Sequence, residues 1–135
     1  MPELPEVEIV KQSLEKKIER KKIKKVIIKN RNLRFKIPAN FEKNLNNKII
    51  KKVSRLSKYI IFHFSDYSFC ILHLGMSGTI HLVGKSKKEK FTNASFYSSP
   101  NLPKNHNHIR IKFDNLCLVY NDPRRFGFIL FIKNK

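Results

Sequence analysis

The stretch HIRIKFDNLCLVY, residues 108–120, holds two runs that predict β-strands and a short turn between them. In the first run the apolar residues Ile109, Ile111 and Phe113 alternate with basic ones, so one side of the strand faces a core and the other faces water. The Asp-Asn pair at 114–115 favours a tight turn. A half-buried strand joined to its neighbour by so short a turn predicts an antiparallel sheet.

Similar runs lie on both sides of this hairpin. They are rich in β-branched and aromatic residues and occupy residues 25–30, 48–64, 69–83 and 126–132. Residues 66–68, Asp-Tyr-Ser, form a second candidate turn. Many short strands separated by turns predict two packed sheets, a β-sandwich.

Residues 5–19 differ, because their apolar residues recur every three or four positions, as in an amphipathic helix. These residues are Val7, Val10, Leu14 and Ile18. Residues 36–47 hold either a short helix or an irregular segment. The predicted fold class is mainly β with α (α+β), an antiparallel β-sandwich flanked by an N-terminal helix.

The chain has 135 residues, which predicts one domain over 1–135. Its 29 Lys and Arg residues against 10 Asp and Glu give a formal charge of +19, which points to a polyanionic partner, with nucleic acid as the leading candidate. The alternative is codon bias in an AT-rich genome, since 22 of the basic residues are Lys and 13 further residues are Asn. That bias does not explain where the arginines lie.

No run approaches the roughly 18 apolar residues of a membrane span, and the N-terminus lacks a signal-peptide pattern, so a cytoplasmic protein is expected. Cys70 and Cys117 lie in apolar runs and are expected to be buried, reduced thiols. His106 and His108 form an HxH motif, but the spacing of the ligand types does not favour a metal site. The Lys-, Ser-, Asn- and Pro-rich segment 84–107 predicts a long, mobile loop.

Two loop motifs carry unusual residues. HLGMSG, residues 73–78, places glycines around Met76 after a strand, so that Met76 lies either at a loop tip or tucked into the core. NDPRRFG, residues 121–127, is either an ordinary solvated turn or a turn that presents two arginines and a phenylalanine. Arginine beside an aromatic residue on a projecting loop is typical of nucleic-acid binding.

The N-terminus MPELPEVE also admits two interpretations. Proline and acidic residues suit the first turn of a helix, and the same residues can form an active site. Pro2 and Glu3 precede the predicted helix, where capping does not require them, which favours the second interpretation.

Together these motifs resemble the catalytic N-terminal domain of the formamidopyrimidine-DNA glycosylases, bacterial enzymes that repair oxidised purines. The resemblance covers essentially the whole chain and rests on MPELPEVE (1–8), SRLSKY (54–59), HLGMSG (73–78), HNH (106–108) and NDPRRFG (121–127).

The resemblance implies a catalytic set of Pro2, Glu3 and Lys58. Removal of Met1 would free the secondary amine of Pro2, whose pKa of roughly 8 leaves a neutral fraction that can attack a sugar C1′ and form a Schiff base. Glu3 would act as the acid, a role that requires partial burial of its carboxyl group. Lys58, expected in a strand, would donate a proton during β-elimination.

The resemblance also implies how the chain would hold DNA. His106 and Arg124 would grip the DNA backbone, and Arg125 would add a phosphate contact. Met76, Arg124 and Phe126 would fill the void left when the damaged nucleotide is extruded from the duplex.

The partner implied is double-stranded DNA that contains oxidised purines or abasic sites, and the chain is expected to be a monomer. No cofactor or metal is expected here, because the family's zinc lies on a C-terminal finger that these 135 residues lack, together with the helix-two-turn-helix domain. A clamp-completing second chain is therefore an open possibility. The alternative function is a truncated, non-catalytic DNA-binding domain or gene fragment that needs a partner for activity.

Overall fold

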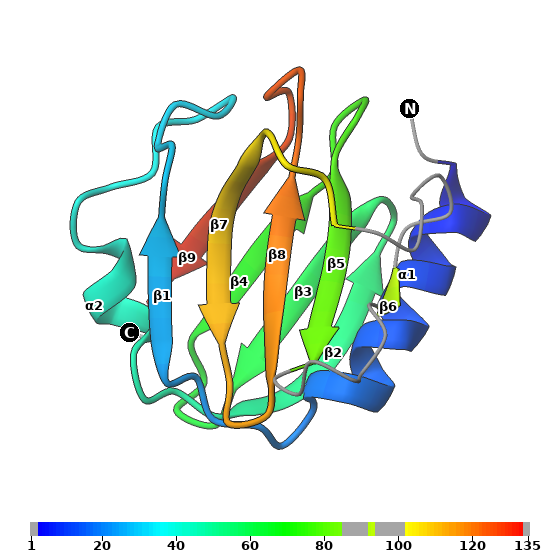
Figure 1. Cartoon of the computed structure of the whole chain (residues 1–135). Helices are drawn as coiled ribbons and strands as arrows, with labels where there is room; N and C mark the ends of the chain where they lie inside the picture. Colours follow the sequence, from blue (N-terminus) through cyan, green and yellow to red (C-terminus); the bar gives the residue numbers. More distant parts are fainter. Residues whose placement is uncertain (1–2, 85–91, 94–101, 134–135) are drawn as a thin grey trace.

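In the computed structural model, which describes residues 3–84, 92–93 and 102–133, two antiparallel sheets pack face to face (Figure 1). One sheet has the strand order β1-β7-β8-β5-β6 and the other the order β2-β3-β4-β9. The strands of the first sheet are β1 (Lys25–Ile28), β5 (Thr79–Gly84), β6 (Thr92–Asn93), β7 (Asn107–Lys112) and β8 (Leu116–Asn121), and those of the second are β2 (Ile50–Leu56), β3 (Tyr59–Phe64), β4 (Phe69–His73) and β9 (Phe128–Ile132). The predicted β-sandwich is confirmed.

The hairpin of β7 and β8 forms as its alternation predicts. Ile111 pairs with Leu118 and Lys112 with Cys117 across the two strands. Ile109, Ile111 and Phe113 are buried while Lys112 is exposed. The apolar face therefore points into the space between the sheets, and the basic face points outward.

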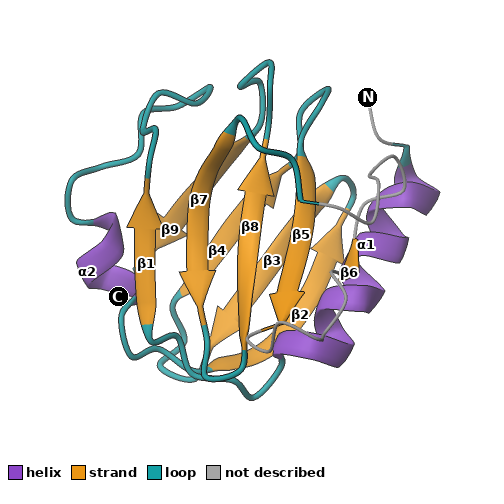
Figure 2. Ribbon diagram, viewed as in Figure 1, coloured by secondary structure: helices purple, strands orange, loops and turns teal. Residues whose placement is uncertain are grey.

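Two helices flank the sandwich (Figure 2). Helix α1 (Leu4–Ile18) buries the four residues that its periodicity predicts, and it packs along β2. Helix α2 (Phe41–Leu45) resolves the open question over residues 36–47, and it buries Phe41 and Leu45 beside β1.

The chain passes twice from one sheet to the other at the same end of the sandwich. Apart from the connection of β1 to β2, which also changes sheets, one crossing joins β4 to β5 and the other joins β8 to β9. Because β4 pairs with β9 and β5 pairs with β8, the two connecting loops, 74–78 and 122–127, must lie side by side. We call these two loops the tip (top of Figure 1).

Several expectations need correction. The run 48–64 is two strands, and Lys58 lies in the turn between them rather than in a strand. Cys70 is fully buried, and burial raises the pKa of its thiol, whereas Cys117 is only partly buried.

Within 84–107, β6 pairs with β5. Much of that segment, including four of its five lysines, lies outside the described residues, so its predicted mobility stays a prediction. In the described part of the chain, no helix is long and apolar enough to span a membrane.

Candidate nucleic-acid interface

The two loops of the tip touch through their backbones. Gly75 has φ +64°, and a Cβ atom placed on it would lie 2.4 Å from the backbone nitrogen of Gly127. A Cβ atom on Gly127 would lie 2.0 Å from the Tyr120 hydroxyl oxygen and 2.5 Å from the His73 carbonyl oxygen. All three distances are too short for a side chain. Glycine at 75 and 127 is therefore what lets the loops approach this closely.

Asp122 holds the tip together from inside. Its side chain is fully buried, and each of its carboxylate oxygens accepts two hydrogen bonds. Oδ1 accepts from the Ser77 hydroxyl at 2.6 Å and the Arg125 N–H at 3.1 Å. Oδ2 accepts from the Tyr120 hydroxyl at 2.6 Å and the Gly127 N–H at 2.9 Å. One carboxylate thus links strand β8 and both tip loops.

Tyr120 serves that carboxylate as a donor. Burial raises the pKa of its hydroxyl, and the hydrogen bond to Asp122 raises it further, so the proton stays on Tyr120 in the folded protein. Tyr120 therefore keeps the proton that it donates to Asp122 across the physiological pH range.

The segment before β7 joins the same network. The His108 ring Nε2 lies 2.7 Å from the Asp122 carbonyl oxygen, and the Asp122 N–H donates to the His106 carbonyl at 3.1 Å. Asn121 donates to the Asn107 side chain at 2.9 Å. His106 itself is exposed and has φ +70°. His106 therefore lies at the surface beside the 122–127 loop of the tip.

The side chains at the outer surface of the tip are those that the motifs single out. Met76 is 46% exposed and Phe126 is 44% exposed, so the alternative in which Met76 lies in the core is wrong. The Arg124 guanidinium carbon lies 5.3 Å from the centre of the Phe126 ring, a cation–π contact. The Arg124 N–H donates to the Ser77 hydroxyl at 3.1 Å, which ties the arginine to the loop that carries Met76.

Arg125 points in another direction. Its φ is +57°, and its guanidinium reaches the Asn32 carbonyl oxygen at 3.4 Å. The Arg34 N–H donates to the Gly127 carbonyl at 3.2 Å. The loop after β1 is therefore attached to the tip. Because Asp122, the single acidic residue of the two tip loops, is buried, the charge that they present outward is positive.

Glu3 and Lys58 lie together, as the predicted site requires. The Lys58 Nζ atom is 3.9 Å from Glu3 Oε2. Two expectations about Glu3 are wrong. It occupies the N-cap position of α1, where its N–H donates to the Glu6 carboxylate at 3.0 Å, so helix capping does use it. Its side chain is 70% exposed and is not partly buried. Pro2 lies outside the described residues.

The turn that carries Lys58 is fastened to α1. The Arg55 Nε atom pairs with Glu8 at 2.7 Å, and Arg55 also donates to the Ser57 carbonyl inside the turn at 2.9 Å. The Arg55 guanidinium lowers the pKa of Glu8 from 4.5 to about 2. The ion pair therefore keeps the helix start and the Lys58 turn in one arrangement down to acid pH.

The first prediction concerns acid stability. The pKa of Glu8 is lower in the folded chain than in the unfolded one, so its contribution to the free energy of unfolding is present above pH 4.5 and lost as the pH falls toward 2. Arg55→Gln is expected to reduce the loss of stability over that range, measured by urea unfolding at several pH values. Lys48→Gln is the parallel variant in the same measurement. It removes a second ion pair in which a lysine lowers the pKa of a carboxyl group, because Lys48 lowers the pKa of Asp66 to about 2. An unchanged pH profile in Arg55→Gln would contradict the assignment.

His73 is a site residue that the sequence reasoning missed. Its Nδ1 atom accepts a hydrogen bond from the Gly75 N–H at 2.9 Å, and its ring stacks on Phe128 at 5.4 Å between centres. Burial lowers the pKa of His73, and the positive charges of Arg34 and Lys58 lower it further. A neutral ring is what leaves Nδ1 free to accept from Gly75. The signal was available, because His73 opens the HLGMSG motif.

Asp122, Ser77 and Tyr120 were also missed as site residues. Asp122 and Ser77 lie inside the quoted motifs. The sequence does not reveal, however, that the Ser77 and Tyr120 hydroxyls donate to the buried Asp122 carboxylate. Within the described ranges, no group of three or more His, Cys, Asp and Glu side chains is placed to hold a metal ion.

Comparisons with known proteins agree with this geometry. The sequence profile of the formamidopyrimidine-DNA glycosylase N-terminal domain matches residues 1–129. The formamidopyrimidine-DNA glycosylase of Wolbachia pipientis subsp. Culex pipiens is 38% identical over an alignment 136 residues long, which covers all of this chain and 45% of that protein. The enzyme of Paraburkholderia xenovorans is 35% identical over 130 residues, 96% of this chain and 43% of that protein.

Solved structures agree as well. The Lactococcus lactis Fpg protein in complex with DNA that contains an abasic site superposes with a TM-score of 0.79 and 32% identity, over 97% of this chain and 44% of that one. The chain thus spans less than half the length of the relatives that it matches. A matched profile over nearly all its residues, a shared fold and the five motifs together show that the chain belongs to the formamidopyrimidine-DNA glycosylase family, as its N-terminal domain.

Proposed function

We propose that this chain is the catalytic domain of a bifunctional DNA glycosylase that removes oxidised purines from duplex DNA and then cleaves the strand at the abasic site. The observation that carries the proposal is the tip, which presents exposed Met76 and a stacked Arg124–Phe126 pair on two interlocked loops. Exposed apolar side chains on a cationic surface suit entry into a base stack rather than packing in a core.

Entry into the stack solves a physical problem of the reaction. The target nucleotide lies inside a duplex, and extruding it leaves a gap whose lost stacking costs a few kcal/mol. In the proposed complex Met76 enters that gap, Arg124 faces the orphaned base and Phe126 wedges beside it. His106, Arg124 and Arg125 contact phosphates, which sets the register without reading sequence.

The proposed nucleophile is the secondary amine of Pro2, freed when Met1 is removed. Its nitrogen forms a bond to C1′ as the bond between C1′ and the base breaks, and the base departs with a proton. The ring oxygen then leaves C1′ and takes a proton, while the nitrogen releases its own, which gives an iminium cation. Loss of a proton from C2′ then expels the 3′ phosphate, and the strand is cleaved.

Glu3 and Lys58 are proposed as the proton-transfer groups of these steps. Glu3 would protonate the ring oxygen, and Lys58 would donate a proton during the elimination. Their separation of 3.9 Å supports a joint role at one reaction centre. In the free chain Glu3 is largely exposed, so the burial that its acid role requires would come from bound DNA.

Double-stranded DNA with oxidised purines or abasic sites is the proposed partner. The +19 charge and the positive tip support a DNA partner, and the Lactococcus lactis relative has been solved with abasic-site DNA. The same protein has also been solved with DNA that contains an N7-benzyl-Fapy-dG lesion, a further support for modified purines as substrates.

The test is reductive trapping. Borohydride delivers hydride to the iminium carbon and fixes the chain to DNA, so a duplex with one abasic site is expected to give a covalent adduct visible on a denaturing gel. Removal of Met1 is first verified by mass spectrometry. An N-terminal extension that converts the Pro2 amine to an amide is expected to abolish the adduct.

Two outcomes would overturn the proposal. If the extended chain traps as well as the free one, the nucleophile is another amine, and Lys58→Arg then tests the nearest candidate. If the chain with a free Pro2 amine binds the duplex but forms no adduct, the non-catalytic DNA-binding alternative is correct.

A further inference from the structure

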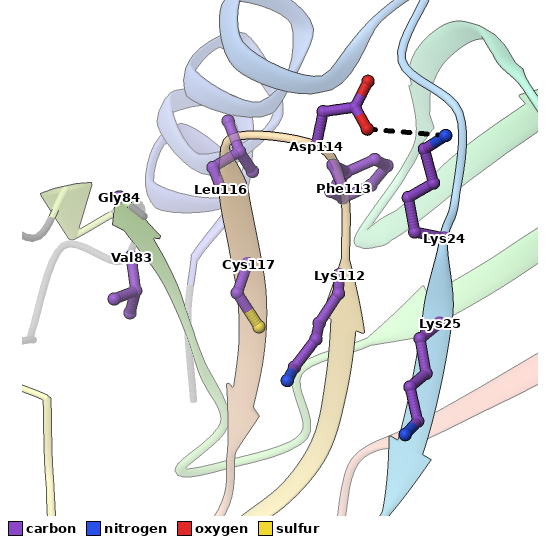
Figure 3. A pocket seen from close by; sticks show the side chains of 9 residues that line it. All are labelled: Lys24, Lys25, Val83, Gly84, Lys112, Phe113, Asp114, Leu116 and Cys117. Carbon is purple, nitrogen blue, oxygen red and sulfur yellow. Dashed lines mark ion pairs between the residues drawn. The ribbon is translucent and has the colours of Figure 1, made fainter. Parts of the chain in front are cut away.

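A second site lies at the end of the sandwich opposite the tip, beside the turn between β7 and β8 (Figure 3). Strand register creates it. Val83 lies opposite Cys117, Cys117 opposite Lys112, and Lys112 opposite Lys25. These four side chains form one row across four neighbouring strands, on the outer face of the five-stranded sheet.

This row lines a pocket of about 360 Å³. That volume lies within the range of ligand pockets, roughly 300 to 1,000 Å³, and is enough to hold one large apolar side chain. One half of its lining is apolar and comes from Val83, Phe113, Leu116 and Cys117. An apolar floor gives a phosphate group nothing to bind, but it gives an aliphatic or aromatic side chain a place to be buried.

The other half of the lining is cationic. Lys24, Lys25 and Lys112 lie along one side of the floor, at the start of β1 and on β7, and Asp114 is the one acidic residue of the lining (Figure 3). Asp114 is paired with Lys24 at 3.4 Å (Figure 3). Neither Lys25 nor Lys112 has an ion-pair partner among the residues that the structure describes. The pocket therefore combines an apolar floor with two lysines that have no ion-pair partner in the described part of the chain.

We infer that this pocket is a docking site for an acidic peptide segment of a partner protein, one that carries a large apolar anchor residue among its carboxylates. The anchor side chain occupies the floor, and the carboxylates pair with Lys25 and Lys112. Apolar anchors surrounded by complementary charge are what give short segments specific binding. Because the pocket and the tip lie at opposite ends of the strands, a bound peptide leaves the tip free.

The inference does not depend on the proposed catalytic function, and it is tested by fluorescence anisotropy. The probe is a fluorescein-labelled peptide Asp-Asp-Asp-Asp-Leu-Phe, and the matched peptide Asp-Asp-Asp-Asp-Ser-Ser keeps its charge without the anchor. The Leu-Phe peptide is expected to bind more tightly by about tenfold or more. The double variant Lys25→Glu/Lys112→Glu is expected to lose at least about tenfold in affinity for the Leu-Phe peptide.

The control variant is Lys51→Glu/Lys52→Glu, which changes the net charge equally on exposed positions of the other sheet and is expected to leave peptide affinity within about twofold. The rate at which the Cys117 thiol is labelled shows whether the peptide binds in this pocket. Cys70 is fully buried, so a thiol reagent labels Cys117, and saturating peptide is expected to slow that labelling. Equal affinity for the two peptides would overturn the inference. It would also be overturned if a short oligonucleotide of the same charge as the peptide displaced the probe and the pocket variants left probe binding unchanged.

Discussion

Replacing Asp122 by alanine is expected to lower the free energy of unfolding by about 3 to 5 kcal/mol, because the change removes a buried carboxylate that accepts four hydrogen bonds. The Tyr120 and Ser77 hydroxyls and the Gly127 N–H would remain without that acceptor in a place that water reaches poorly, whereas the Arg125 N–H keeps its bond to the backbone carbonyl oxygen of residue 122 at 3.2 Å. Because the native chain brings its two tip loops together around this carboxylate, the substitution is expected to disturb the structure of the tip and to lower the stability of the whole chain. Urea unfolding monitored by circular dichroism measures the effect.

Asp114→Ala is the matched control, because it removes an equal side chain from the turn at the opposite end of the sheet. Asp114 is 78% exposed and forms one surface ion pair, so its removal is expected to change stability by no more than about 0.5 kcal/mol. Asp122→Asn preserves the volume but presents an NH₂ group to two of the four donors. It is expected to be intermediate. If Asp122→Ala unfolds at the same urea concentration as Asp114→Ala, the buried carboxylate does not hold the tip.

The elements of the fold were predictable wherever a local pattern reflects burial. The four apolar residues of α1 recur with helical spacing, and the residues of β7 alternate, because in each case one face meets the core. Turns inside long apolar runs were harder to see. Ser57 and Lys58 form the turn between β2 and β3, with Ser57 at φ +54°, a conformation that the SRLSKY sequence does not reveal.

The motifs predicted which residues form the site, but they did not predict how those residues are arranged in space. Exposure of Met76 and Phe126 agrees with what the motifs imply, since glycine-flanked turns project their side chains. The role of Asp122 was not predictable, because it depends on four donors that converge on one buried carboxylate, and one of them, Ser77, lies 45 positions away along the chain. The exposure of Glu3 has the same origin. Its environment depends on how α1 meets the Lys58 turn, which is a tertiary contact.

The crossing topology is what turns these separate motifs into one surface. HLGMSG and NDPRRFG lie about fifty residues apart in sequence, yet each is a passage from one sheet to the other, and the strand pairs β4–β9 and β5–β8 force the passages together. Ser77, the residue after Met76, then connects the two loops. Its hydroxyl donates to the Asp122 carboxylate and accepts from the backbone N–H of Arg124. The three side chains proposed to fill the void are therefore positioned as one unit.

Met76→Ala is expected to reduce the rate of borohydride trapping on a duplex abasic site by about tenfold to a hundredfold, because filling the void offsets an unstacking cost of a few kcal/mol and each 1.4 kcal/mol is a factor of ten. The same variant is expected to trap single-stranded abasic DNA at the native rate, since that substrate has no paired stack to open. Met76 is 46% exposed, so its truncation should leave the stability of the fold unchanged.

Tyr67→Ala is the control for this experiment, as it truncates a 72% exposed side chain in the β3–β4 turn, away from the tip, and should trap both substrates normally. The ratio of duplex to single-strand rates separates the void-filling role from the chemistry. A Met76→Ala variant that loses both rates equally would mean that Met76 supports the reaction centre itself, and one that loses neither would mean that Arg124 and Phe126 hold the extruded state alone. Only a selective loss on the duplex agrees with a methionine that enters the base stack.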